Sequence, residues 1–178
     1  NWLDIDTITK SQTVTLDRQD NKEGNQAYII KSPLNDDELF VIEFRKKAPI
    51  DYTNEDSLDR GIGGSGIIVY RINTTVENLS NNFNQTGVYI FRPNEPGKEF
   101  LQNTEEARIL SAYLSQESGR TSIGTADLTK TLEDGALTFS DGTNSGIVIG
   151  NVSSSSGDSM TCTVTIPEIA ETDLWKNT

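Results

Sequence analysis

The residues of this chain that could do chemistry are acidic. Its 178 residues include 27 Asp and Glu, one Cys and no His. Without imidazole the chain cannot form a Ser-His-Asp or Cys-His nucleophile pair, and it cannot form the HExxH zinc site of metalloproteases. Two carboxylates across a cleft could still hydrolyse a glycoside, but no spacing marks such a pair. We therefore predict that this chain is not itself an enzyme.

One acidic loop carries oxygen ligands of the kind that calcium prefers. The candidate ligands lie within a single nine-residue stretch and are Asp51, Asn54, Asp56 and Asp59. Calcium takes about six to eight oxygen ligands from such loops, although the spacing here is not that of an EF-hand. The stretch is a candidate calcium site, and solvated loop charge is the alternative interpretation.

Two further motifs have simpler interpretations. The glycines Gly61, Gly63 and Gly66 match a dinucleotide-binding pattern, but they precede an apolar strand instead of joining a strand to a helix. We therefore reject cofactor binding there. Cys162 alternates with threonines in a strand-like run, and neither His nor a helix N-terminus accompanies it. It is predicted to be a small buried hydrophobic residue and not a reactive thiol.

A short pattern of an apolar residue or Glu, an aromatic residue and then Arg recurs three times, ending at Arg45, Arg71 and Arg92. These guanidinium groups could form a cluster for a carboxylate ligand or a partner surface. Alternatively, they close strand ends, stack on aromatic rings and pair with acids such as Glu43. With the apolar start of the chain, they give the candidate interface residues Trp2, Glu43, Arg45, Arg71 and Arg92.

Short apolar runs separated by polar turns predict an all-β fold, an antiparallel β-sandwich of jelly-roll-like type. The expected strands are 3–8, 13–17, 26–31, 38–45, 66–73, 87–92, 145–152 and 159–166. The run 38–45 is apolar on both faces, which indicates a central strand, and the last two strands are expected to form a hairpin. Residues 104–114 fit either a short helix, the only one expected, or a strand. Residues 1–167 are predicted to form one domain, and 168–178 a tail or linker.

The net charge of −12 argues against nucleic acid, which attracts basic surfaces, and against anionic lipid. The apolar runs are too short to insert in a membrane as helices. The abundance of Asn, Ser and Thr with few Lys residues suggests an exported protein, secreted or at the cell surface.

Six segments follow one another in a recognisable order: Trp2-Leu3, Tyr28-Ile29-Ile30, the run from Phe40 to Arg45, the run from Gly63 to Asn73, Tyr89 to Pro93, and Gly146 to Ser153. Their order resembles the region that follows the catalytic helices in M6-type (immune inhibitor A-like) secreted bacterial metalloproteases. The resemblance implies a non-catalytic accessory domain beside or positioning substrate for an upstream catalytic domain. Zinc is then expected only in that domain, before Asn1.

Two other functions remain open. The chain could be an independent β-sandwich module that binds a protein or a glycan, for which Tyr52 and Tyr113 are the available aromatic platforms. It could also be an enzyme with a carboxylate pair. The accessory-domain hypothesis predicts an unusually apolar face, and Trp175 near the C-terminus could belong to a junction with a following domain.

Overall fold

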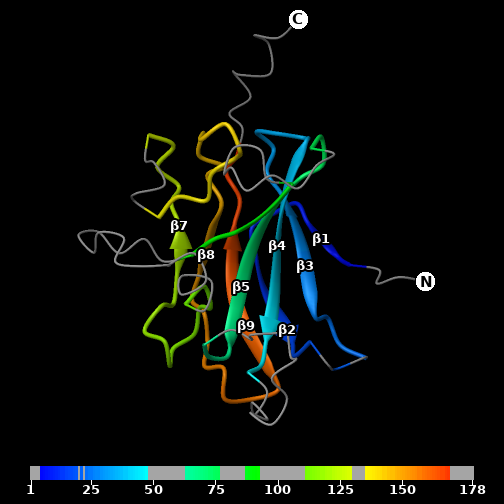
Figure 1. The fold of residues 1–178 in the computed structure, drawn as a ribbon, viewed down its shortest axis with the longest axis vertical. Helices are drawn as coiled ribbons and strands as arrows, with labels where there is room; N and C mark the ends of the chain where they lie inside the picture. Colours follow the sequence, from blue (N-terminus) through cyan, green and yellow to red (C-terminus); the bar gives the residue numbers. More distant parts are fainter. Residues whose placement is uncertain are drawn as a thin grey trace, which may run out of the picture.

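The structure, a computed structural model, describes residues 5–19, 21, 23–47, 63–76, 87–92, 111–129 and 135–168. These residues form two β-sheets that pack face to face (Figure 1). None of the described residues is helical. The described part of the chain therefore contains no helix that could cross a membrane. The predicted all-β sandwich is confirmed.

Sheet A has five strands, which in spatial order are β1 (Thr7–Ile8), β3 (Ala27–Lys31), β4 (Glu38–Arg45), β5 (Gly66–Asn73) and β6 (Val88–Ile90). The strands from β3 to β6 follow one another in an antiparallel meander, while β1 pairs parallel to β3. The predicted central strand 38–45 has the expected bounds and lies in the middle of the sheet.

Sheet B has four strands, which in spatial order are β2 (Gln12–Asp17), β9 (Ser159–Thr165), β8 (Val148–Gly150) and β7 (Ile123–Gly124). All its pairs are antiparallel, and β8 and β9 form the predicted hairpin. The predicted strand 145–152 is shorter than expected. The side-chain oxygens of Asn144 and Ser145 accept hydrogen bonds from the main-chain N–H groups of Gly146 and Ile147, and Gly146 has φ +69°. These local contacts bend the chain out of an extended conformation, so the strand begins later than predicted.

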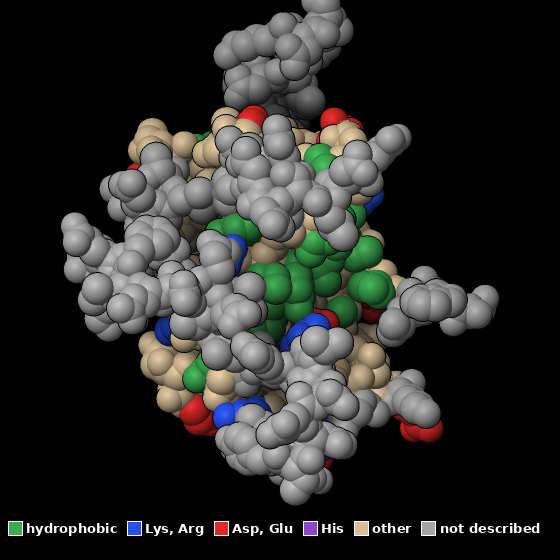
Figure 2. All heavy atoms as spheres, in the orientation of Figure 1, with side chains coloured by type: hydrophobic (Ala, Val, Ile, Leu, Met, Phe, Trp, Pro, Cys, Tyr) green, Lys and Arg blue, Asp and Glu red, His purple; other side chains and the backbone are tan. Residues whose placement is uncertain are grey.

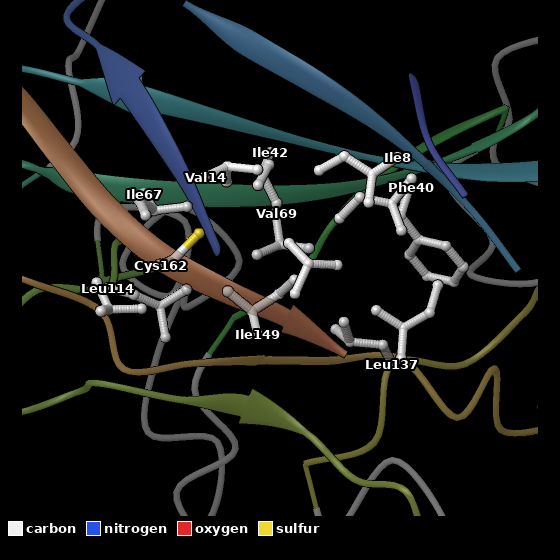
Figure 3. Packing of buried hydrophobic residues seen from close by; sticks show 14 of the residues in the cluster. Ile8, Val14, Phe40, Ile42, Ile67, Val69, Leu114, Leu137, Ile149 and Cys162 are labelled. Atoms are coloured by element: carbon white, nitrogen blue, oxygen red, sulfur yellow. The ribbon is translucent and has the colours of Figure 1, made fainter. Parts of the chain in front are cut away.

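One hydrophobic core fills the space between the sheets (Figure 3). Along β4 buried and half-buried residues alternate strictly, because successive side chains of a strand point to opposite faces. Cys162 is buried among the core residues, as predicted, and burial raises the pKa of its thiol to about 12. Each fully buried Ile, Leu or Phe stabilises the fold by about 1.5–3 kcal/mol. The core members labelled in Figure 3 are Ile8, Val14, Phe40, Ile42, Ile67, Val69, Leu114, Leu137, Ile149 and Cys162.

Several predicted segments fall partly outside the described residues. Of the predicted strand 3–8, residues 5–8 are described and only Thr7–Ile8 is strand. Of the stretch 104–114, residues 111–114 are described; they are not helical, and Leu114 forms an antiparallel bridge with Ile67. Most of the predicted tail 168–178 also lies outside. The two-residue strand β7 was not predicted.

Candidate interaction surface

The outward face of sheet A is apolar. The strand registers place Ile29, Val41, Tyr70 and Ile90 in one row across four strands, and Lys31, Leu39, Ile72 and Val88 in the next row. Apart from the exposed, charged Lys31, the seven remaining side chains are half-buried or exposed, and Val88 is 44% exposed. We call these seven residues the outer apolar face; hydrophobic atoms are visible on this side of the molecule in Figure 2. Solvated sheet faces usually carry polar side chains, so this face is unusual.

A small polar cluster lies on the same side of sheet A. The carboxylate of Glu43 accepts hydrogen bonds from Arg45 Nε and from the Tyr70 hydroxyl. Burial, followed by the hydrogen bond to Glu43, raises the pKa of Tyr70 well above its ordinary value, so the hydroxyl stays protonated and remains a donor. Because Arg45 neutralises Glu43, this part of the face carries no net charge and would be less costly to desolvate than a lone carboxylate.

Arg71 was predicted to belong to the same interface, but it faces the interior. Its side chain is fully buried, and its Nε lies 3.3 Å from Oε2 of the buried Glu38. Its Nη1 donates to the Thr138 carbonyl at 3.3 Å. Burial lowers the pKa of Arg71, and Glu38 opposes that shift. Arg71 therefore does not close a strand end at the surface; its role is an ion pair inside the sandwich.

Glu38 is held from a second direction by the loop after Phe139. Its carboxylate accepts hydrogen bonds from the Ser140 main-chain N at 2.9 and 3.1 Å and from Ser140 Oγ at 2.6 Å. Among the described residues, Glu38 is the one buried acid. Because Arg71 and Ser140 already engage its oxygens, Glu38 is arranged as a structural ion and not as a free acid or base.

Arg92 and Arg71 meet at one aromatic ring. Both guanidinium carbons lie 5.2 Å from the centre of the Tyr89 ring, within the range of a cation–π interaction. The predicted interface set is thus divided: Glu43 and Arg45 lie together on the outward side of sheet A, while Arg71 and Arg92 gather around Tyr89. Arg45 pairs with Glu43, and Arg71 pairs with Glu38 and lies over the Tyr89 ring. These contacts fit the interpretation in which the arginines pair with acids and stack on aromatic rings better than the interpretation in which they form one cluster for a ligand.

A serine-rich loop before β9 is fixed by two charged residues that the sequence did not single out. Lys46 Nζ donates to the carbonyls of Ser155, Ser156 and Gly157 at 2.7, 2.8 and 2.7 Å. Glu117 accepts from the Ser155 main-chain N at 2.9 Å, and from the hydroxyls of Ser154 and Ser155. These bonds, with the Ser154 hydroxyl contributing most, lower the pKa of Glu117 to about 2. No sequence spacing links these distant positions, so the pattern could not reveal them.

Next to this loop is a shallow depression of about 340 Å³. Its lining includes Tyr113, Lys46, Glu117 and several serines. Tyr113, one of the two predicted aromatic platforms, is half-buried and packs against Ala112 and Ile68. The depression offers an aromatic edge and hydroxyl groups, although many of its polar groups already bond to one another.

The other predicted site residues lie outside the described part of the chain. These are the candidate calcium ligands Asp51, Asn54, Asp56 and Asp59, the interface residue Trp2, and the aromatic residues Tyr52 and Trp175. Among the residues that are described, no group of three or more Cys, Asp or Glu side chains is placed to hold a metal ion. Calcium binding by the 51–59 loop therefore stays a prediction.

Comparison of the chain with protein-family models, with curated proteins and with solved structures found no match.

Proposed function

We propose that this chain is a non-catalytic accessory module of a secreted, M6-like zinc metalloprotease, and that its outer apolar face packs against an upstream catalytic domain of the same polypeptide. Zinc and the catalytic residues would belong to that domain. The order of β motifs from Trp2 to Ile166 supports the relationship, and the apolar face supports the packing role.

The observation that carries the proposal is the pair of rows across β3, β4, β5 and β6 in which every side chain except Lys31 is hydrophobic or aromatic. Contiguous exposed apolar patches mark sites where another surface docks. Completing the burial of one half-buried Val or Ile contributes on the order of 1 kcal/mol. Seven apolar side chains would therefore contribute on the order of 7 kcal/mol to docking, before the ordering cost of docking is subtracted.

The local charge of this face also favours a protein surface as its partner. The chain as a whole carries a net charge of −12, but the polar cluster beside the face pairs Glu43 with Arg45 and the Tyr70 hydroxyl, and Lys31 at the β3 end of one row is the charged side chain within the two rows. A partner with an apolar surface and a few hydrogen-bonding groups could cover this cluster without stranding a charge. No positive surface suited to nucleic acid is needed for this role.

The first test is to read the coding sequence upstream of Asn1. The proposal requires an HExxH helix and a signal peptide there. The second test uses that full-length protein with Val41→Lys, which places a charge in the centre of the outer apolar face. Thr163→Lys is the matched control, because Thr163 is a half-buried strand residue like Val41 but lies on the outer side of sheet B.

We expect Val41→Lys to separate the thermal unfolding of this module from that of the catalytic domain, and Thr163→Lys to leave one coupled transition. The absence of an upstream HExxH helix would overturn the protease relationship. A Val41→Lys protein that unfolds like the control would overturn the assignment of the face.

A second function, binding of a polar ligand such as a glycan by an independent module, is favoured by the depression beside Tyr113. Aromatic rings with nearby hydroxyl and charged groups are a common way to hold a sugar. Binding of the whole chain to a glycan array that is lost in Tyr113→Ala would support this alternative. An array without signal would remove it.

A further inference from the structure

The free edge of β2 is open at its centre. β2 is an edge strand of sheet B and pairs only with β9 among the described strands. The main-chain N of Arg18 donates to Asp158 across this pair at 3.0 Å. Because main-chain groups of an antiparallel strand alternate in direction, the even-numbered residues of β2 bond to β9, and Thr13 and Thr15 direct their main-chain groups to the other side.

Part of this edge is already covered. The main-chain N of Asp17 donates to the Asn25 carbonyl at 2.8 Å, and the Tyr28 hydroxyl donates to the Thr15 carbonyl at 3.2 Å. For the N–H and C=O of Thr13 and the N–H of Thr15, the described residues provide no partner on this side. A depression of about 440 Å³, lined by residues of β1 and β2 and by Tyr28, lies beside these groups.

This edge also lacks the usual protection against pairing. Natural edge strands carry Lys, Pro or bulges that prevent the addition of another strand. The stretch 11–16 contains no charged residue and no proline, in a chain with 42 charged residues (15 Lys and Arg plus 27 Asp and Glu). It is therefore a place where two acidic copies of this chain could approach with little local repulsion.

We propose that β2 pairs with β2 of a second copy of this chain, antiparallel and around a two-fold axis at Thr13, so that sheet B continues across the dimer. Around this axis the Thr13 N–H and C=O bond to the same two groups of Thr13 in the other copy. The Thr15 N–H then faces the Ser11 carbonyl. One unpaired residue thus supplies both halves of a self-complementary contact, as an isologous interface requires.

A second copy fits this edge better than an unrelated extended peptide does. A peptide that paired along the whole of β2 would meet the covered N–H of Asp17, whereas β2 of a second copy begins at Gln12, opposite Val14, and does not reach Asp17. The two-fold pairing at Thr13 uses the open N–H and C=O of Thr13 and the open N–H of Thr15. It also brings the Ser11 N–H to the Thr15 carbonyl, whose second lone pair can accept beside the Tyr28 hydroxyl. The flanking side chains are Thr and Ser, and cross-strand pairs of threonines are favourable in antiparallel sheets.

The first experiment measures the mass of the full chain in solution over a wide concentration range. We expect the mass to rise from 19.6 kDa to twice that value. Thr13→Pro removes the N–H that faces the open edge and leaves the β9 ladder intact, so we expect it to stay monomeric. Thr13→Val keeps the N–H, is the matched control, and should still dimerise. A chain that is monomeric at every concentration overturns the proposal, as does a Thr13→Pro protein that dimerises normally.

The second experiment remains decisive if the proline variant does not fold. In the proposed pairing the two Thr13 Cα atoms lie about 5.5 Å apart, within the range of a disulfide, so Thr13→Cys should cross-link two copies under mild oxidation. Thr163 lies beside Thr13 on the neighbouring strand β9, so in the proposed dimer the two Thr163 positions are three strand spacings, about 14 Å, apart. Thr163→Cys should therefore not cross-link. The native Cys162 is buried and provides no competing thiol. Equal cross-linking of both variants, or of neither, contradicts the two-fold pairing.

Discussion

Glu38 and Arg71 form an ion pair inside the sandwich, with Arg71 Nε 3.3 Å from Glu38 Oε2 and both side chains at most 5% exposed. They come from neighbouring strands of sheet A, and the Ser140 loop closes over them from the other side. Removing one member of a buried pair leaves an uncompensated charge, which is more costly than the pair is stabilising.

We therefore expect Arg71→Met to lower the free energy of unfolding by about 3–5 kcal/mol, because Glu38 would be left charged in the interior. Adding Glu38→Gln should restore much of this loss, since the amide oxygen can still accept from Ser140 and no charge remains. Urea unfolding of the two single variants and of the double variant measures the coupling between the residues.

The matched control is the half-exposed pair of Glu43 and Arg45, whose side chains are 23% and 43% exposed. Arg45→Met should change the free energy of unfolding by about 1 kcal/mol or less. Strictly additive effects of Glu38→Gln and Arg71→Met would contradict the pairing.

Glu117 should make the stability of the serine loop depend on pH. Its pKa in the folded chain is about 2, below the value of about 4.3 for an unfolded chain. A lowered folded pKa gives stability that is present above the unfolded pKa and is lost as the pH falls through the folded pKa. We expect the parent to be more stable than Glu117→Gln above pH 5, and the difference to shrink between about pH 4 and 2.

Chemical unfolding at a series of pH values checks this prediction. Glu23→Gln is a suitable control, because Glu23 is also exposed but has no comparable set of serine donors. A difference between the parent and Glu117→Gln that stays constant from pH 6 to pH 2 would show that the carboxylate is not held by Ser154 and Ser155.

Much of the fold could be predicted from the sequence, because strong periodic runs determine strands. The predicted ranges 38–45 and 66–73 match β4 and β5, since each is a continuous run of strand-forming residues ended by charged or polar residues. The hairpin of β8 and β9 followed from the turn-rich linker 153–158 between the two runs, and the burial of Cys162 followed from the alternation of threonine with apolar residues. Strand β7 was missed because two residues provide no periodicity.

The sites were less predictable, because they depend on which face of a strand a residue occupies. β5 is apolar on both faces, so its sequence does not show that Tyr70 points outward and Arg71 inward. The partners of these residues come from another strand, Glu43 for Tyr70 and Glu38 for Arg71. Likewise, Lys46 meets its three carbonyls more than a hundred residues later in the chain.

Lys46 should be important for the order of the serine loop. Its ammonium group uses its three donors on the carbonyls of 155–157, and hydrogen bonds from a charged donor are worth about 1.5–3 kcal/mol each before screening by water. Because the site is half-exposed, we expect Lys46→Met to cost about 1–2 kcal/mol in total and to speed hydrogen exchange at Ser155 and its neighbours.

Lys47→Met provides the comparison for this variant. Lys47 is exposed and makes one such contact, to the Gly63 carbonyl at 3.0 Å. Its loss should leave exchange in the serine loop unchanged. If Lys46→Met and Lys47→Met had the same exchange pattern, the three-carbonyl contact would not be what orders the loop.

Gly66 should be intolerant of a side chain, because the chain passes very close to it. A Cβ at this position would lie 2.4 Å from the carbonyl oxygen of Leu114, where Ile67 and Leu114 exchange main-chain hydrogen bonds of 2.9 Å in both directions. The obstacle is backbone, which cannot rotate away as a flexible side chain could. We expect Gly66→Ala to destabilise the fold by about 2–4 kcal/mol, by forcing the 111–115 segment away from β5.

At Gly150 an added Cβ would meet nothing within 4 Å, so Gly150→Ala should stay within about 0.5 kcal/mol of the parent. Thermal and urea unfolding of the two variants decide the matter, and equal stability of both would mean that Leu114 does not pack against the start of β5.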